Sequence, residues 1–148
     1  MIRRFSLPDL DRILEIEQQA FPKSPYDIAT FLNLYWFYPE TFLVYVHRNH
    51  GWEKGAILAY IVFSEDGHII SIAVDPKWRK KGIGKTLVDR AMNHPHIKKI
   101  KAEVRMGNTG AQAFYERMGF RVVGTVPNYY GDEDALVVEK RTSRPSVP

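Results

Sequence analysis

The stretch Ser71-Ile72-Ala73-Val74-Asp75-Pro76-Lys77-Trp78-Arg79-Lys80-Lys81-Gly82-Ile83-Gly84-Lys85 decides the fold. A strand pattern ends, a basic loop with two glycines follows, and a helical apolar pattern begins. Backbone N–H groups and the positive end of the dipole at a helix start form an anion site. Gly82 and Gly84 carry no side chains that would keep a phosphate away from the backbone. We therefore expect a phosphorylated ligand here; the alternative is a simple turn with a solvated basic face.

Two commoner phosphate loops do not fit this stretch. Gly84-Lys85-Thr86 ends like a Walker A motif, but Arg79 occupies the position of the required earlier glycine. The dinucleotide pattern Gly-x-Gly-x-x-Gly also fails, because Leu87 occupies the third glycine position. These mismatches argue against a GTPase, an ATPase and a nicotinamide-dependent enzyme.

On both sides of this loop, the spacing of apolar residues predicts a mixture of strands and helices. Leu10, Ile13, Leu14, Glu17 and Phe21 recur at helical spacing, and Gly119 is placed to end a later helix. Asn49-His50-Gly51 separates two strands of a hairpin. Strands are expected at 2–5, 41–47, 54–63, 68–74, 99–105, 120–126 and 135–139, and helices at 10–21, 27–35, 84–93 and 108–118. Hairpins followed by crossover helices imply a mixed sheet with helices on both faces.

Composition sets the class of protein. The chain has 148 residues, 45% of them hydrophobic and 26% charged, which fits one domain at 1–141 with a loose tail at 142–148. There is no apolar run long enough for a membrane span and no signal-peptide pattern, so a cytoplasmic protein is expected. The absence of Cys excludes disulfides, thiolate-bound metals and Cys nucleophiles. The net charge of +4 suits any polyanion, including nucleic acid, which we consider unlikely beside a phosphorylated cofactor.

Two motifs carry a resemblance to a known family. Arg79-Lys80-Lys81-Gly82-Ile83-Gly84 matches Arg/Gln-x-x-Gly-x-Gly/Ala, the acetyl-coenzyme A signature of the GNAT acetyltransferases. Asn108-x-x-Ala111-x-x-Phe114-Tyr115-x-x-x-Gly119-Phe120 resembles that family's second signature. The resemblance implies an α/β GNAT fold, whose mostly antiparallel mixed sheet is splayed in the middle and covered by helices on both faces.

The resemblance also implies a cofactor site for acetyl-coenzyme A. Backbone amides from Lys80 to Lys85 would bind the pyrophosphate, the strand edge at 72–74 would pair with the pantetheine arm, and Asn108 would hold the cofactor from the other side. The implied cofactor-binding residues are Ile72, Ala73, Val74, Arg79, Lys80, Lys81, Gly82, Ile83, Gly84, Lys85, Asn108 and Tyr115.

Two residues are candidates for acid–base chemistry. Acetyl transfer needs a neutral amine, a donor for the developing oxyanion and a proton for the departing thiolate. Glu103 shares a strand face with Lys101 and Arg105, so on sequence alone it can equally be part of an exposed ion-pair ladder. Glu103-Val104-Arg105 before Asn108 resembles the RimI-type N-terminal acetyltransferases, which implies that Glu103 is the general base. The same resemblance makes Tyr115, otherwise a core aromatic, the acid that faces the coenzyme A sulfur.

The resemblance to RimI-type enzymes extends to substrate residues. Phe21 and Tyr26 lie in a proline-rich helix–helix loop, and Tyr129-Tyr130 precede an acidic run, Asp132-Glu133-Asp134. In similar enzymes these segments line the groove for the substrate's first residues, so a peptide or protein N-terminus is the implied partner. Some relatives have an Arg-x-Tyr-Tyr run, whereas this chain has Pro127-Asn128 before Tyr129, a departure that concerns the choice of substrate and not the type of reaction.

Two other functions stay open on sequence grounds. The acidic run 132–134 also suits a small-molecule amine such as a polyamine or an antibiotic. A non-catalytic coenzyme A or nucleic-acid binder could retain the same basic loop. His94-Pro95-His96 is interpreted as a surface loop without metal, because no carboxylates accompany it.

Overall fold

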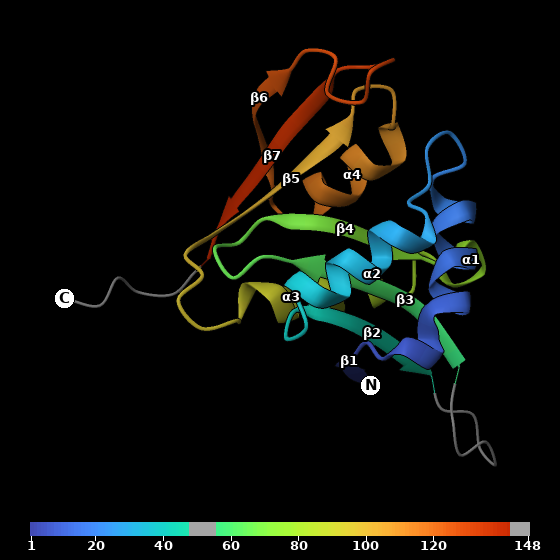
Figure 1. Cartoon of the computed structure of the whole chain (residues 1–148). Coiled ribbons are helices and arrows are strands. Elements are labelled where there is room, and N and C mark those ends of the chain that lie inside the picture. The colour runs from blue at the N-terminus through green and yellow to red at the C-terminus, as the bar shows by residue number, and fades with distance from the viewer. Residues whose placement is uncertain (48–55, 143–148) are drawn as a thin grey trace. The chain divides into compact units, whose positions relative to one another are not determined.

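The computed structural model describes residues 1–47 and 56–142. The expected turn Asn49-His50-Gly51, the start of the strand expected at 54–63 and the tail residues 143–148 lie outside the described residues. The chain divides into two compact units (Figure 1). The first comprises Met1–Ser64 and Ile70–Ala91, and the second comprises Glu65–Ile69 and Met92–Pro148.

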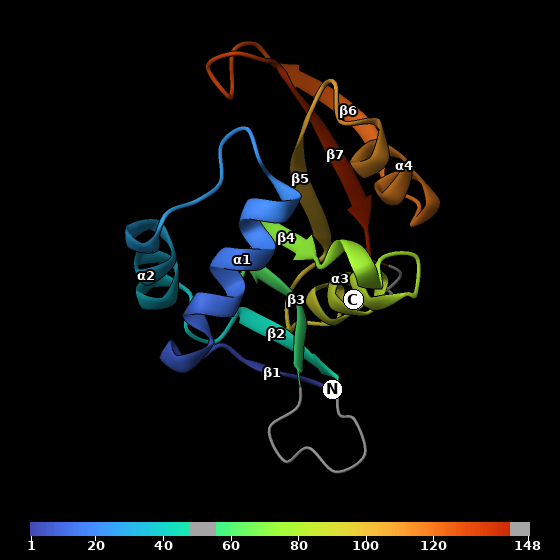
Figure 2. The ribbon, with the colours of Figure 1, turned by 90° about the vertical axis from the view of Figure 1, so that its right-hand side faces the viewer.

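The first unit is built on a four-stranded sheet with spatial order β1-β2-β3-β4. Its strands are β1 (Ile2–Arg4), β2 (Phe42–His47), β3 (Ala56–Phe63) and β4 (Ile69–Val74), and its helices are α1 (Leu10–Ala20), α2 (Ile28–Phe37) and α3 (Ile83–Met92). Short 3-10 turns cover Leu7–Asp9 and Pro76–Trp78. Figure 2 shows α1 and α2 on one side of this sheet and α3 on the other, as the sequence pattern predicts.

The core of the first unit lies between α1, α2 and the sheet. Ile13 and Ile16 of α1 and Phe31 of α2 are fully buried with Phe42 of β2. Phe42 stacks on Phe5 with ring centroids 4.2 Å apart. Burying side chains of this size stabilises a fold by roughly 1.5–3 kcal/mol each, so this cluster holds both helices on the sheet.

Helix α2 differs in length from the sequence prediction. Asp27 accepts a hydrogen bond from the backbone N–H of Thr30 at 2.9 Å and so caps the N-terminus. The helix was expected to end at Tyr35, but it continues through Phe37, although Trp36 and Phe37 are 81% and 70% exposed. Exposed aromatic residues extend a helix as long as no breaker intervenes, and here the first breaker is Pro39.

The second unit contains a three-stranded antiparallel sheet and one helix. The strands are β5 (Lys99–Arg105), β6 (Arg121–Val126) and β7 (Ala135–Arg141) in the order β5-β7-β6, and the helix is α4 (Thr109–Arg117). Gly119 has φ +90°, and the N–H of Phe120 donates to the carbonyl of Tyr115 at 3.0 Å. This geometry confirms that Gly119 ends α4.

The expected order of strands and helices is confirmed. Most ends agree within a residue or two, and β7 runs two residues past its expected end because Arg141 pairs with Lys99. The predicted mixed sheet is present as two sheets, divided between β4 and β5 in chain order. His68, expected inside the fourth strand, instead makes an isolated parallel bridge with Lys101.

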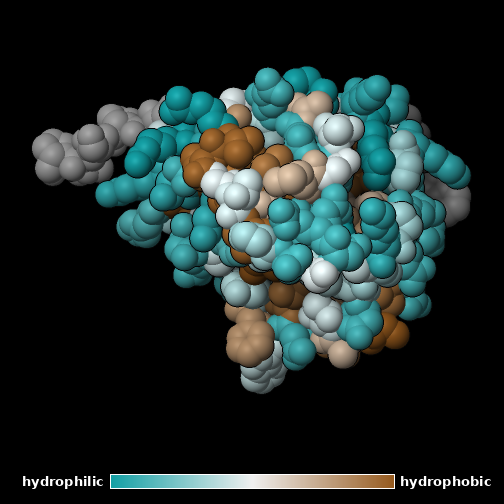
Figure 3. Space-filling model, turned by 90° about the horizontal axis from the view of Figure 1, so that it is seen from above, coloured by the Kyte–Doolittle hydropathy of each residue, from teal (hydrophilic) through white to brown (hydrophobic). Residues whose placement is uncertain are grey.

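The face of the protein shown in Figure 3 is largely hydrophilic. The face presented in Figure 3 carries exposed hydrophobic residues between polar and charged ones. All residues of β6 are exposed, including the apolar Val122 and Val123 at 58% and 57%. Within the described ranges, there is no helix with the length and apolarity needed to cross a membrane.

Candidate active site

Glu103 lies in the middle of β5, opposite Val137 of β7. Its side chain is 15% exposed, and its Oε2 lies 2.6 Å from Nε2 of His68, whose side chain is 30% exposed. Arg105 forms its own ion pairs with Asp132 and Glu133. This partly buried pair of a carboxylate and an imidazole differs from the exposed ion-pair ladder left open by the sequence.

A glycine brings His68 to β5. Gly67 has φ +99°, and its carbonyl accepts the backbone N–H of Lys101 at 2.9 Å. A Cβ on Gly67 would lie 2.0 Å from the carbonyl oxygen of Lys99. The close approach of these two backbones places His68 beside Lys101, two residues along the strand from Glu103.

Replacing Gly67 by Ala should therefore destabilise the protein and displace His68. The clash and the positive φ together are expected to lower the free energy of unfolding by about 2 kcal/mol or more, measured by chemical denaturation. Gly131→Ala is the matched control, because Gly131 has φ +85° but open space around its Cβ position. Equal losses in the two variants would contradict the close-approach explanation.

Tyr115 of α4 is buried, at 5% exposure. Its ring packs edge-on against Phe114 and Phe120, with centroids 5.2 and 5.0 Å away. Burial, then the nearby charges of Tyr130 and Glu103, raise the pKa of the Tyr115 hydroxyl well above its ordinary value. The phenol therefore keeps its proton at neutral pH and remains a hydrogen-bond donor close to Glu103.

The tyrosine pair predicted to bind substrate is close to the same carboxylate. The rings of Tyr129 and Tyr130 meet edge to face, with centroids 4.8 Å apart. Tyr129 is 48% exposed, and burial together with the charge of Glu103 raises the pKa of its hydroxyl. The second unit thus places His68, Tyr115 and Tyr129 near the Glu103 carboxylate, with the Tyr130 ring against that of Tyr129.

The acidic run is tied into the protein by Arg105. Its Nη1 lies 2.9 Å from Asp132 Oδ1 and 3.2 Å from Glu133 Oε1, and its guanidinium carbon lies 4.2 Å from the centre of the Tyr130 ring. Asp134 accepts the backbone N–H of Asn128 at 2.9 Å. All three carboxylates thus bond to neighbouring groups of the second unit and hold the β6–β7 connection in place.

Asn108 caps α4. Its side-chain oxygen accepts the N–H of Ala111 at 3.0 Å, so this oxygen is already engaged. A side-chain amide also carries an NH₂ group that can donate hydrogen bonds.

The first unit carries the glycine loop. Lys80 and Gly82 adopt positive φ values of 62° and 83°, and Thr86 makes the first helical bond of α3 by donating to the Gly82 carbonyl at 3.0 Å. The N–H groups that precede Thr86 have no intrahelical acceptor. Four exposed cations surround this turn: Arg79, Lys80, Lys81 and Lys85. A Cβ on Gly82 would meet nothing within 4 Å, which leaves room for a bulky anion.

Asp75 anchors the start of this loop. Its Oδ2 lies 2.5 Å from Nη2 of Arg12, and its Oδ1 accepts the N–H of Lys77 at 2.9 Å. Burial raises the pKa of the Asp75 carboxyl, but the bonds from Arg12 and Lys77 outweigh burial and lower that pKa below 3.8.

The lowered pKa of Asp75 predicts a pH-dependent contribution to stability. The contribution is present above pH 3.8 and is lost as the pH falls through the lower folded-state value. Asp75→Asn should therefore be less stable than the natural protein at pH 7, and the two unfolding free energies should converge in acid. Asp11→Asn, an exposed change on α1, is the control. If the free energies of unfolding of Asp75→Asn and the natural protein differed by the same amount at every pH, this prediction would be contradicted.

Phe21 and Tyr26, the other predicted substrate residues, flank the connection between α1 and α2. Both are half-buried and pack against the core of the first unit. The ring of Tyr26 meets the ring of Phe31 edge to face at 5.8 Å.

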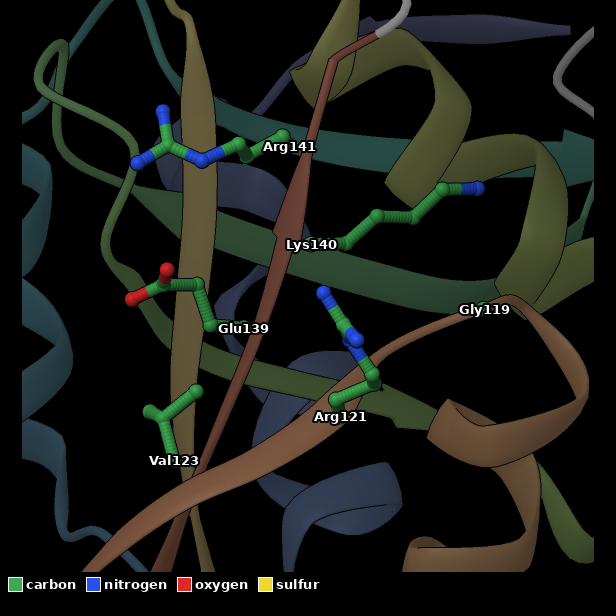
Figure 4. Close-up of a pocket in the computed structure, with 6 residues that line it drawn as sticks. All are labelled: Gly119, Arg121, Val123, Glu139, Lys140 and Arg141. Carbon is green, nitrogen blue, oxygen red and sulfur yellow. The ribbon is translucent and has the colours of Figure 1, made fainter.

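A pocket of about 260 Å³ lies elsewhere in the second unit (Figure 4). It is lined by Gly119, Arg121, Val123, Glu139, Lys140 and Arg141, none of which is a predicted site residue. Figure 4 shows Glu139 and Lys140 pointing to opposite sides of β7, as alternation along a strand requires. In residues 1–47 and 56–142 there is no group of three side chains suited to a metal ion.

Sequence reasoning missed His68 and the role of Arg105. His68 contacts Glu103 across 35 positions of sequence, and Arg105 contacts Asp132 across 27. The available signal for His68 was Gly67, a glycine directly before a strand, which often marks a close approach between backbones.

Comparison with known proteins identifies the family. The family model described as "Acetyltransferase (GNAT) family" matches residues 10–120. The chain belongs to the GNAT acetyltransferase family. It is accordingly an acetyl-CoA-dependent N-acetyltransferase, and the resemblance to this family seen in the two sequence motifs is confirmed.

Similar proteins support this assignment over the full length. An uncharacterized N-acetyltransferase of Methanocaldococcus jannaschii is 39% identical, with 100% of this chain and 96% of that protein covered. A putative ribosomal protein bS18-alanine N-acetyltransferase of Bacillus subtilis is 30% identical, with coverages of 93% and 92%, which supports the RimI-like assignment. The crystal structure of Ard1 from Thermoplasma volcanium has a TM-score of 0.84 at 29% identity and covers 97% of this chain and 98% of its own. The GNAT fold is thus confirmed.

Proposed function

We propose that this GNAT enzyme transfers the acetyl group of acetyl-CoA to the α-amine of a protein N-terminus, by direct attack in a ternary complex. In this proposal the two units act together as a single acetyltransferase domain. The main support for this proposal is the position of Glu103. It is a partly buried carboxylate paired with His68, and it lies near Tyr115 and Tyr129, whose ring meets that of Tyr130.

The glycine loop fits the cofactor that the family uses. Its open space at Gly82, its exposed cations and its helix-start amides, which have no intrahelical acceptor, suit a pyrophosphate. The amides of residues 80–85 and the side chain of Arg79 would hold the phosphates, the edge at 72–74 would hold the pantetheine arm, and Asn108 would donate from its amide. The cofactor supplies an activated acetyl thioester.

Glu103 and His68 suit the removal of a proton from an α-amine. An α-amine has a pKa near 8, whereas a lysine side chain has a pKa near 10.4, so a moderate base is enough for an N-terminus. The carboxylate takes the amine proton, directly or through water, and the imidazole keeps the carboxylate in place. Tyr115, which is protonated at neutral pH, would give its proton to the departing coenzyme A thiolate, and Tyr115 and Glu103 would regain their starting protonation states by proton exchange with water.

The identity of a relative's substrate supports the α-amine. The Bacillus subtilis relative is named for acetylation of an alanine in a ribosomal protein. An alanine side chain has no nitrogen, so the amine that an N-acetyltransferase can modify there is the α-amine. The small-molecule alternative is weakened in turn, because Arg105 and the Asn128 amide already bind the acidic run.

The substrate class is tested with three short peptides that contain lysine. One has a free N-terminus, one has an acetylated N-terminus, and one has a free N-terminus with every lysine acetylated. We expect thiol release from acetyl-CoA with the first and third peptides and none with the second, with mass spectrometry locating the new acetyl group. Equal reaction of the second peptide, or a preference for free polyamines, would overturn the proposal.

A further inference from the structure

A buried chain of polar side chains runs through the first unit. Glu17 of α1 is 2% exposed, Tyr60 of β3 is fully buried, and Ser71 of β4 is 9% exposed. Their neighbours on α1 and α2 are apolar and fully buried: Ile13, Ile16 and Phe31. A carboxyl group in such surroundings costs free energy unless it is hydrogen-bonded, so the position of Glu17 needs a reason.

The hydrogen bonds of these buried polar side chains lead to the connection between α1 and α2. The Tyr60 hydroxyl bonds to Glu17 Oε2 and lies 2.8 Å from Ser71 Oγ. The other carboxyl oxygen, Oε1, accepts the backbone N–H of Tyr26 at 3.1 Å. Tyr60 and Ser71, on two strands of the sheet, thereby fix the carboxyl group that binds Tyr26.

Glu17 holds both ends of this connection. Its backbone carbonyl accepts the N–H of Phe21 at 2.8 Å, and its carboxyl group binds the N–H of Tyr26. Both ends of the segment from Phe21 to Tyr26 are therefore hydrogen-bonded to Glu17. The segment also contains Pro22 and Pro25, which further restrict its backbone. The ring of Tyr26 is also fixed, by its contact with Phe31 at 5.8 Å.

Burial is the main influence on the protonation of the Glu17 carboxyl group. Burial raises the pKa of Glu17, although the bonds from Tyr60 and Tyr26 act in the opposite direction. With the carboxylate charged, Tyr60 donates to Glu17 and can accept from Ser71; a protonated carboxyl group can itself donate to Tyr60. The N–H of Tyr26 donates to Glu17 in both states, so the hold on the connection does not depend on the charge.

We propose that Glu17 is a positioning residue for the peptide substrate: it fixes the 21–26 connection so that Phe21 and Tyr26 present a preformed surface to the substrate's first side chain. This inference rests on the proposed N-terminal substrate. Because Glu17 is buried, it acts through the backbone and not by touching the peptide. Its loss should therefore weaken peptide binding and leave acetyl-CoA binding and turnover nearly unchanged.

Two substitutions at Glu17 distinguish its role as a hydrogen-bond acceptor from the space that its side chain fills. Glu17→Met keeps a similar volume but leaves the Tyr26 N–H and the Tyr60 hydroxyl without this acceptor. Glu17→Gln keeps an oxygen for Tyr26 and offers an amide donor to the Tyr60 oxygen. Thr41→Val is the matched control, because Thr41 Oγ1 is a buried hydroxyl with no hydrogen-bond partner in the described part of the chain.

The measurements are the KM for peptide, the KM for acetyl-CoA, kcat and the hydrogen exchange rate of the Tyr26 amide. For Glu17→Met we expect the peptide KM and the Tyr26 exchange rate each to rise about tenfold, with kcat and the acetyl-CoA KM within about twofold. Glu17→Gln and Thr41→Val should behave like the natural protein. If Glu17→Met does not fold, Tyr60→Phe gives the same test, with smaller changes in the same direction.

Unchanged Tyr26 exchange and peptide KM in a folded Glu17→Met or Tyr60→Phe variant would overturn the inference. An equal loss in Glu17→Gln, which keeps the acceptor, would also overturn it, as would a parallel loss of acetyl-CoA binding. If the natural protein acetylates no peptide, the proposed substrate fails, and the Tyr26 exchange rates still decide whether Glu17 holds the connection.

Discussion

Glu103→Gln should lower kcat by about 10²–10⁴-fold, the usual contribution of a positioned general base, while acetyl-CoA affinity changes little. The amide has nearly the same shape as the carboxylate but cannot accept a proton. His68 would still have a hydrogen-bond partner 2.6 Å away, so the fold around the pair should survive. Steady-state kinetics with a free N-terminal peptide, together with calorimetric titration of acetyl-CoA, measure the two effects separately.

Glu139→Gln is the control for this prediction. Glu139 is a carboxylate on the adjacent strand β7, 3.4 Å from Lys99, and it should be nearly neutral in kcat. A Glu103→Gln enzyme that retains a large fraction of the natural kcat would remove Glu103 from the chemistry. A large loss of acetyl-CoA affinity would instead assign Glu103 to binding.

Gly82→Asp should abolish acetyl-CoA binding with little loss of stability. A carboxylate there would face the pyrophosphate, and two like charges about 4 Å apart repel by about 4 kcal/mol at an effective dielectric constant of 20. Allowing for exposure to solvent, we expect affinity to fall by at least about a hundredfold. Aspartate is among the residues that tolerate the left-handed φ of +83°, and its Cβ would meet nothing within 4 Å.

Gly131→Asp provides a matched comparison. Gly131 has φ +85° and equally open space, but it lies in the β6–β7 connection and outside the proposed phosphate loop. Both variants add one negative charge at a similar backbone geometry, and the acetyl-CoA dissociation constant should rise only in Gly82→Asp. Similar dissociation constants for the two variants would show that the loop does not hold the phosphates.

Local patterns were enough to predict the order of elements. Gly119 lies where predicted, in the left-handed region after α4, and Asn108, expected as the first helical residue, is its N-cap, because both positions depend on neighbouring residues alone. The end of α2 was misplaced by two residues, since propensity does not stop a helix before Pro39. Ends of elements depend on tertiary pairing, as in the Lys99–Arg141 pair that lengthens β7.

The sequence predicted site residues only where a motif resembled the family. The residues around Glu103 left it between a base and an ion-pair ladder, and only the motif resemblance favoured the base. Its contact with His68, which depends on the close approach of Gly67 to β5, could be seen only in the fold. The acidic run could not be interpreted without Arg105, which binds two of its three carboxylates. Glu17 was visible in the sequence as a charged residue on an apolar helical stripe. Its partners Tyr60 and Ser71 lie on distant strands, so its role required the fold.

A titration of backbone amide chemical shifts with acetyl-CoA tests the central claim most directly. The account predicts saturable binding, with the largest shifts at the amides of residues 80–85 and further shifts at 72–74 and Asn108. No saturable binding, or shifts that leave residues 80–85 unaffected, would contradict the account.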